Sequence, residues 1–75
     1  MADIKFEIEE EIAVLSNRGS WYLELNRVSW NGAPAKFDIR TWNDTHTRMG
    51  KGITLTDEEA KALMIALQTE LEDEE

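Results

Sequence analysis

Cysteine is absent from this chain of 75 residues, so neither a disulfide nor a thiolate metal site can stabilise it. No apolar run approaches the roughly 18 residues of a membrane span. Met1–Glu11 also lacks the basic and apolar regions of a signal peptide. These absences favour a single small cytoplasmic domain over residues 1–75. A domain this small buries only about 60% of its unfolded surface, so a homodimer is an expected way to add core.

Catalytic groups are also sparse. His46 is the only imidazole and falls in an expected loop, where a histidine is usually plain surface. Carboxylates gather at Glu9–Glu11 and Glu72–Glu75, but strand neighbours point to opposite faces and a frayed tail holds no fixed geometry. No calcium-loop spacing or histidine–carboxylate spacing is present. We therefore expect no enzyme activity, no metal site and no cofactor.

Positive charge is scarce overall but concentrated in the middle of the chain. The formal net charge is −8, which on its own argues against nucleic acid as a partner. Between Arg18 and Gly52, however, there are six basic residues and three acidic ones, whereas the remaining residues include two lysines and thirteen acidic residues. The positive segment also contains all three tryptophans: Trp21, Trp30 and Trp42.

Period-two alternation marks the N-terminal half as β structure. Apolar residues occupy the even positions from Ile4 to Ile8 and again at Ile12 and Val14, which predicts one long bent strand or two short strands meeting near Glu10. After a turn over residues 16–20, residues 21–30 form a second strand. Its apolar parity switches between Leu25 and Val28, and this switch predicts a bulge or sharp bend near Asn26–Arg27.

Asn31-Gly32 is a strong hairpin signal, because both residues tolerate positive φ. The third expected strand, residues 35–42, has Phe37 and Ile39 on the face expected to be buried. Its other face carries two cations, an acid and an indole: Lys36, Asp38, Arg40 and Trp42. A polar loop and a short strand over residues 53–55 follow.

Thr56-Asp57-Glu58-Glu59 has the spacing of a helix capping box. Beyond it, an apolar stripe with helical periodicity predicts an amphipathic helix and comprises Ala60, Leu63, Met64, Leu67 and Leu71. Ile65 widens this stripe and supports a dimer formed through the helix. Residues 70–75 are expected to be an acidic frayed tail. The expected fold class is therefore α+β, a curved four-stranded antiparallel sheet followed by a C-terminal helix (ββββα), with the helix covering one sheet face.

The uncovered face would suit single-stranded nucleic acid, which needs cations for the phosphates and flat side chains for the bases. Lys36 and Arg40 supply cations, and Trp42 supplies an indole two residues further on. Arg27 and Trp30 could extend this face from the neighbouring strand. The alternative for each tryptophan is a core position. Parity favours the core for Trp21 and Trp30 and leaves Trp42 open between the two roles.

Two motifs carry a family resemblance: Asp38-Ile39-Arg40-Thr41-Trp42, and Lys51-Gly52-Ile53-Thr54-Leu55-Thr56 before a helix. Together they resemble the transcriptional coactivator family called positive cofactor four. The stretch Leu25–Gly32 followed by Lys36–Arg40 is similar to its short bacterial YdbC-like branch.

The resemblance implies a homodimer that binds single-stranded DNA, or melted duplex, with little sequence preference. It also implies that Arg40, Trp42 and Lys51 touch the strand, with Lys36 and Arg48 as neighbours by location. The chain lacks the basic, serine-rich region of eukaryotic members, so DNA repair or recombination is as open as transcription. Two alternatives are RNA binding through the same face and a protein-interaction module with an acidic surface.

Overall fold

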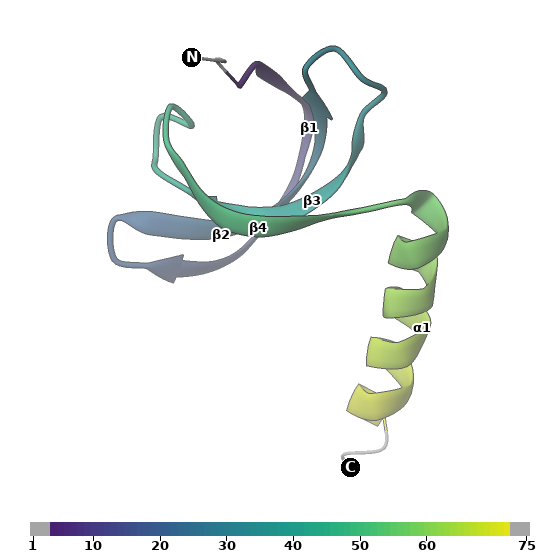
Figure 1. The fold of residues 1–75 in the computed structure, drawn as a ribbon. Coiled ribbons are helices and arrows are strands. Elements are labelled where there is room, and N and C mark those ends of the chain that lie inside the picture. Colours follow the sequence, from purple (N-terminus) through teal and green to yellow (C-terminus); the bar gives the residue numbers. More distant parts are fainter. Residues whose placement is uncertain (1–3, 73–75) are drawn as a thin grey trace.

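The computed structural model describes residues 4–72, and it has the expected α+β architecture (Figure 1). The elements are β1 (Phe6–Arg18), β2 (Trp21–Trp30), β3 (Lys36–Trp42), β4 (Met49–Leu55) and α1 (Asp57–Glu72). The strands form one antiparallel sheet in the order β1-β2-β3-β4. The ββββα prediction is confirmed, although β4 begins at Met49 instead of Ile53. The predicted acidic tail is helical up to Glu72, and its last residues, 73–75, lie outside the described part.

Strand β1 is continuous, which resolves the choice between one bent strand and two short ones. Its register against β2 shifts three times, and each shift leaves one residue of β1 without a partner: Glu9, Ile12 and Leu15. The bulge or sharp bend predicted near Asn26–Arg27 lies at this level of the hairpin, since the β1–β2 register shifts on both sides of these two residues. The extra residues belong to β1, because the β2–β3 register is unbroken. Bulges bend a strand and increase its twist. The sheet accordingly curves strongly and has a concave and a convex face (Figure 1).

The turn between β2 and β3 has the geometry that its sequence predicts. Asn31 and Gly32 have φ values of 53° and 79°, and the Ala33 amide donates a 3.0 Å hydrogen bond to the Trp30 carbonyl. Two positive φ values in a closed four-residue turn define type I′. The Lys5 amide also donates to the Asn31 side-chain oxygen, at 3.1 Å. The turn therefore also holds the beginning of β1 in place.

Burial is highest on the concave face, opposite to the face predicted from parity. Trp42 and Val28 of the concave face are fully buried, and Phe6 of β1 packs at 5.1 Å from the Trp42 ring. On the convex face Phe37 and Ile39 are only half-buried. The prediction that Phe37 and Ile39 face the core while the opposite face lies open is wrong for this chain, because the bent sheet folds around its own concave side.

Helix α1 starts with the predicted capping box. The Thr56 amide donates to Glu59 Oε1 at 2.9 Å, and the Glu59 amide donates to Thr56 Oγ1 at 3.1 Å. The helix then projects away from the sheet (Figure 1), and none of its residues is buried. The prediction that the helix covers one sheet face is therefore wrong within the chain. A single residue, Thr56, joins β4 to α1, and the helix runs outward from that end of the strand.

Gly52 lies where two backbones approach closely. A Cβ added at this position would collide with the Arg40 Cα and Cβ and with the Ile39 carbonyl oxygen. Because most of these atoms belong to the backbone, relief requires β3 and β4 to separate.

We expect Gly52→Ala to lower the free energy of unfolding by about 1–3 kcal/mol, measured by urea denaturation. Gly50→Ala is the matched control, since it meets the Thr41 hydroxyl, which can rotate away. Equal stability of the two variants would contradict the close approach at Gly52.

Candidate nucleic-acid interface

A hollow of about 490 Å³ opens on the concave side of the sheet, between the β2–β3 turn and β4. Its lining includes Trp30, Pro34, Lys36, Arg40, Met49 and Thr54. The volume falls in the range of pockets that enclose small organic groups. An indole, a proline ring and a thioether supply flat and apolar surface, and two cationic side chains stand beside them. We call this site the concave hollow.

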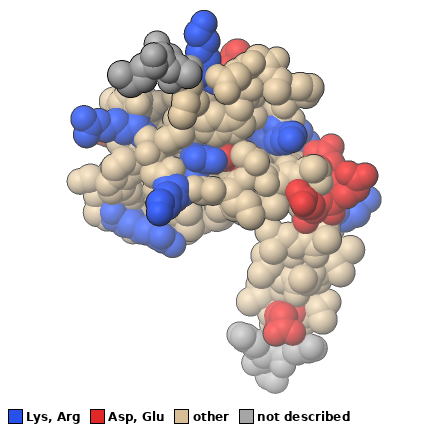
Figure 2. Space-filling model, viewed as in Figure 1, with Lys and Arg blue, Asp and Glu red and all other residues tan. Residues whose placement is uncertain are grey.

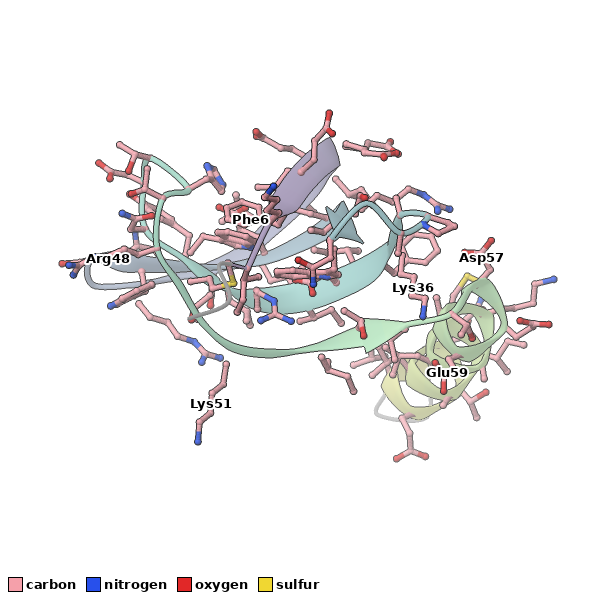
Figure 3. The ribbon with its side chains drawn as sticks, turned by 45° about the horizontal axis from the view of Figure 1, so that its top comes forward. Phe6, Lys36, Arg48, Lys51, Asp57 and Glu59 are labelled. Carbon is pink, nitrogen blue, oxygen red and sulfur yellow. The ribbon has the colours of Figure 1, made fainter. Side chains whose placement is uncertain are left out.

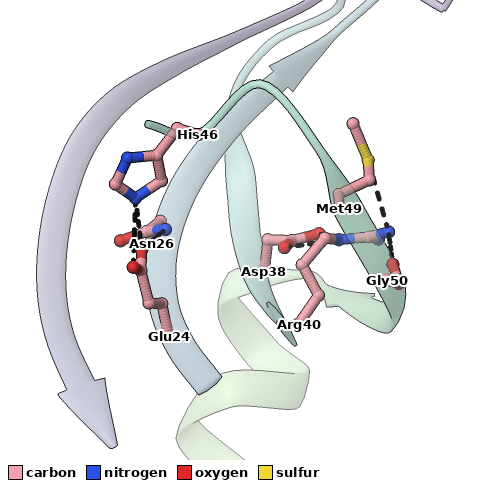
Figure 4. A network of polar contacts seen from close by, with 7 residues as sticks. All are labelled: Glu24, Asn26, Asp38, Arg40, His46, Met49 and Gly50. Atoms are coloured by element: carbon pink, nitrogen blue, oxygen red, sulfur yellow. Dashed lines mark hydrogen bonds and ion pairs between the residues drawn. The ribbon is translucent and has the colours of Figure 1, made fainter. Parts of the chain in front are cut away.

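Arg40 is held on the wall of the concave hollow by contacts on several sides (Figure 4). Its Nε donates to both carboxylate oxygens of Asp38, at 2.7 and 2.9 Å, and its Nη1 reaches the Gly50 carbonyl at 3.4 Å. The guanidinium carbon lies 4.7 Å from the centre of the Trp30 ring. The Arg40 side chain is 14% exposed and that of Asp38 is fully buried. Arg40 is thus a fixed group instead of the open surface cation that parity predicted.

Lys36 differs from Arg40 because it is exposed and has no ion-pair partner among residues 4–72. It shares a face with Arg40, four residues along β3, and lines the same hollow. Trp30 lies on the neighbouring strand and also borders it. The structure therefore brings three of the seven predicted site residues together: Trp30, Lys36 and Arg40.

Trp42 lies beside this site but is enclosed. Its ring packs against Phe6 at 5.1 Å and His46 at 5.6 Å, and its exposed fraction is 0%. Its indole N–H has no hydrogen-bond partner in the described part of the chain. Of the two roles left open by the sequence, the geometry favours the core. Trp42 could stack on a base only after Phe6 or His46 had moved aside.

The remaining predicted cations lie elsewhere. Arg27 is on the convex face, with its guanidinium 4.1 Å above the Phe37 ring and 3.7 Å from a carboxylate oxygen of Asp57. The prediction that Arg27 extends the Arg40 face is therefore wrong, because Arg27 pairs with Phe37 across β2 and β3. Arg48 and Lys51 are exposed and point away from the sheet in Figure 3.

A buried polar cluster beside Trp42 was missed by the sequence analysis. His46 Nε2 lies 2.8 Å from Glu24 Oε1, and Asn26 Nδ2 donates to the same oxygen at 2.9 Å (Figure 4). Glu24 and Asn26 are buried, and His46 has a positive φ of 59°. The prediction that His46 is plain surface is wrong. Nothing in the sequence signals this contact, since Glu24 and His46 are 22 residues apart.

Charge is segregated over the surface that Figure 2 shows. Lysine and arginine side chains are spread over the sheet, while acidic side chains gather where α1 begins. The first helical turn contributes Asp57, Glu58 and Glu59. On this face an anionic ligand is therefore drawn to the sheet instead of the start of the helix, whereas β1 carries the exposed glutamates Glu7, Glu9, Glu10 and Glu11.

Within residues 4–72, no group of three or more histidine, aspartate or glutamate side chains is arranged to hold a metal ion. In the same part of the chain, no helix is both long and apolar enough to cross a lipid bilayer.

A strongly curved antiparallel sheet with cations and an indole on its concave face, followed by one helix, defines a small α+β binding module. The family model described as Transcriptional Coactivator p15 (PC4) matches residues 17–66. The chain belongs to this family, so it contains a nucleic-acid-binding domain of the coactivator type, and the resemblance to positive cofactor four is confirmed. Assignment to the YdbC-like branch stays a prediction. A similar protein is an uncharacterized protein of Treponema pallidum (strain Nichols), 47% identical over 62 residues, which cover 81% of this chain and 73% of that protein.

Proposed function

We propose that this protein binds single-stranded DNA in the concave hollow, with little overall sequence preference, and acts in transcription regulation or in DNA repair or recombination. The observation that carries the proposal is the meeting of Trp30, Lys36 and Arg40 on one concave surface. Single strands expose the flat faces of their bases, which stack on aromatic side chains, whereas a duplex keeps its bases paired and stacked. Family membership supports the same ligand class.

Within this proposal the residues have distinct roles. Lys36 neutralises a phosphate at the rim of the hollow, and Trp30 supplies apolar surface for a base. Lys51 and Arg48 are exposed cations on β4 and at the end of the preceding loop, where they contact the phosphates of a strand leaving the hollow. Trp42 supports the site from below instead of stacking directly.

We also propose that the protein is a homodimer formed through α1 and the convex face. In the single chain the apolar stripe of the helix is uncovered, with Met64, Leu67 and Leu71 at least half exposed. Ile53 of β4 is 54% exposed on the convex side. A chain of this size that leaves so much apolar surface in water is marginally stable. A second copy that covers both surfaces would supply the missing core.

The function is tested by titrating labelled oligo(dT) with the protein at several salt concentrations and following fluorescence anisotropy. We expect saturable binding that weakens with salt. Lys36→Ala should reduce the slope of log affinity against log salt by about 0.7, the value for one phosphate contact on a single strand. Lys61→Ala, on the exposed helix, is the control that keeps the slope. No binding at low salt would refute the proposal and favour a protein-interaction module.

Competition separates DNA from RNA. The same hollow offers stacking and phosphate contacts to both, because only contacts with the 2′-hydroxyl distinguish them. We expect an RNA oligomer of matched sequence to compete more weakly than DNA. Stronger competition by RNA would assign the concave hollow to RNA.

A further inference from the structure

We propose that Asp38 is a positioning residue that converts Arg40 from a phosphate contact into a hydrogen-bond donor for the edge of one nucleobase. The inference rests on the proposed binding of single-stranded DNA and assigns a different role to each cation of the concave hollow. Lys36 then supplies affinity that depends on salt, whereas Arg40 supplies a base preference at one position.

The contacts of Arg40 hold its guanidinium in a fixed geometry. Both carboxylate oxygens of Asp38 lie within hydrogen-bonding distance of Arg40 Nε, at 2.7 and 2.9 Å. The guanidinium carbon also lies over the Trp30 ring, 4.7 Å from its centre, and Nη1 contacts β4 at the Gly50 carbonyl. These contacts fix both the position of the guanidinium and the orientation of its plane. A fixed fork of donors suits a base edge, which presents its acceptors in a fixed direction.

Asp38 also neutralises the charge of Arg40. Asp38 is fully buried, so the pair with Arg40 is a neutral unit with little exposure to water. Only Nε of Arg40 holds Asp38, and breaking that contact would leave the carboxylate buried without a counter-charge, which is strongly unfavourable. Arg40 therefore keeps Asp38 while its Nη groups meet a strand. A cation that is already neutralised releases few counterions from DNA and adds little to the salt dependence.

Arg40 keeps some of its donors free for a ligand. Nη2 of Arg40 has no hydrogen-bond partner among residues 4–72, and Nη1 makes only long contacts, 3.4 Å to the Gly50 oxygen and 3.9 Å to the Met49 sulfur. Arg40 lines the concave hollow, so these donors are what it offers to a ligand. Carbonyl oxygens of guanine and thymine accept from such donors, whereas adenine presents an amino group at the corresponding position. The geometry thus favours a keto base over adenine.

Three variants test the assignment, each measured with oligo(dT) and oligo(dA) over a range of salt. Asp38→Asn keeps the side-chain shape but leaves Arg40 as an unneutralised cation. We expect the salt slope to steepen by about 0.7 and the dT-to-dA affinity ratio to fall about tenfold, the size of one lost base contact. Comparing ratios between variants cancels the self-stacking of oligo(dA).

The double variant Asp38→Asn/Arg40→Met removes both charges and keeps the hollow filled, so it tests the idea even if Asp38→Asn alone folds poorly. Its dT-to-dA affinity ratio should fall as in Asp38→Asn, while its salt slope should equal that of the unmodified protein. Lys36→Ala should show the opposite pattern, a smaller slope and an unchanged ratio.

A salt slope that falls in the double variant as much as in Lys36→Ala would overturn the inference, because Arg40 would then be an ordinary phosphate contact. An unchanged base ratio in both Asp38 variants would also overturn it. The proposed function itself fails only if the unmodified protein does not bind oligo(dT).

Discussion

Replacing Trp42 with alanine is expected to lower the free energy of unfolding by about 3–5 kcal/mol, the usual cost of deleting a large buried aromatic side chain. Trp42 has no exposed surface and packs against Phe6 and His46, on two other segments of the chain. Alanine would leave a cavity beside the concave hollow, and Phe6 of β1 and His46 of the loop before β4 would both lose an aromatic contact. The effect is measured by urea denaturation followed by circular dichroism.

Trp21→Ala is the matched control for this experiment. Trp21 begins β2 at the far end of the β1–β2 hairpin and is only half-buried, so its loss should cost clearly less. The core assignment of Trp42 would be contradicted by a variant with unchanged stability that no longer binds oligo(dT). That result would instead return Trp42 to the role of a stacking residue.

The second large effect concerns the helix. Leu67→Asp places a charge in the middle of the apolar stripe, at a residue that is 50% exposed in the single chain. If a second copy covers this stripe, the substitution should weaken dimerisation about 30-fold or more, the effect of losing an interface residue worth about 2 kcal/mol. Sedimentation velocity over a range of protein concentrations measures the change.

Gln68→Asp adds the same charge one position along the helix, away from the centre of the stripe, and should leave the dimer intact. Its side chain donates to Glu72 on the helix surface at 3.2 Å. A wild-type protein that sediments as a monomer at micromolar concentration would refute the homodimer. Equal weakening by both substitutions would show that the interface is not centred on Leu67.

Local features of the fold could be predicted because each depends on a few neighbouring residues. The Asn31-Gly32 turn follows from the tolerance of both residues for positive φ, and the start of α1 follows from the reciprocal hydrogen bonds of Thr56 and Glu59. Strand alternation likewise separated the two faces of β3. Alternation predicted a bend of β1 near Glu10, but it does not determine which face becomes concave, because that depends on how the bulges in β1 turn the strand.

The candidate site was predicted only in part, because strand parity places residues on a face but does not show how deeply that face is buried. The parity of β3 correctly put Lys36 and Arg40 on one face. Trp30 on β2 borders the same hollow. Parity also implied that this face was open, whereas Asp38 is fully buried there. A buried aspartate is unexpected until its arginine partner is seen. The contact between Glu24 and His46 depends on how a loop folds back over the sheet, which residue types alone do not reveal.

A nuclear magnetic resonance titration of the three tryptophan indole N–H signals with oligo(dT) locates the bound strand on the protein. Trp30 borders the concave hollow, whereas Trp21 lies at the far end of the hairpin. We expect the Trp30 signal to shift progressively and saturate with added strand, while the Trp21 signal stays in place. A Trp30 signal that does not move, with shifts confined to amides of α1 or the convex face, would contradict binding in the concave hollow.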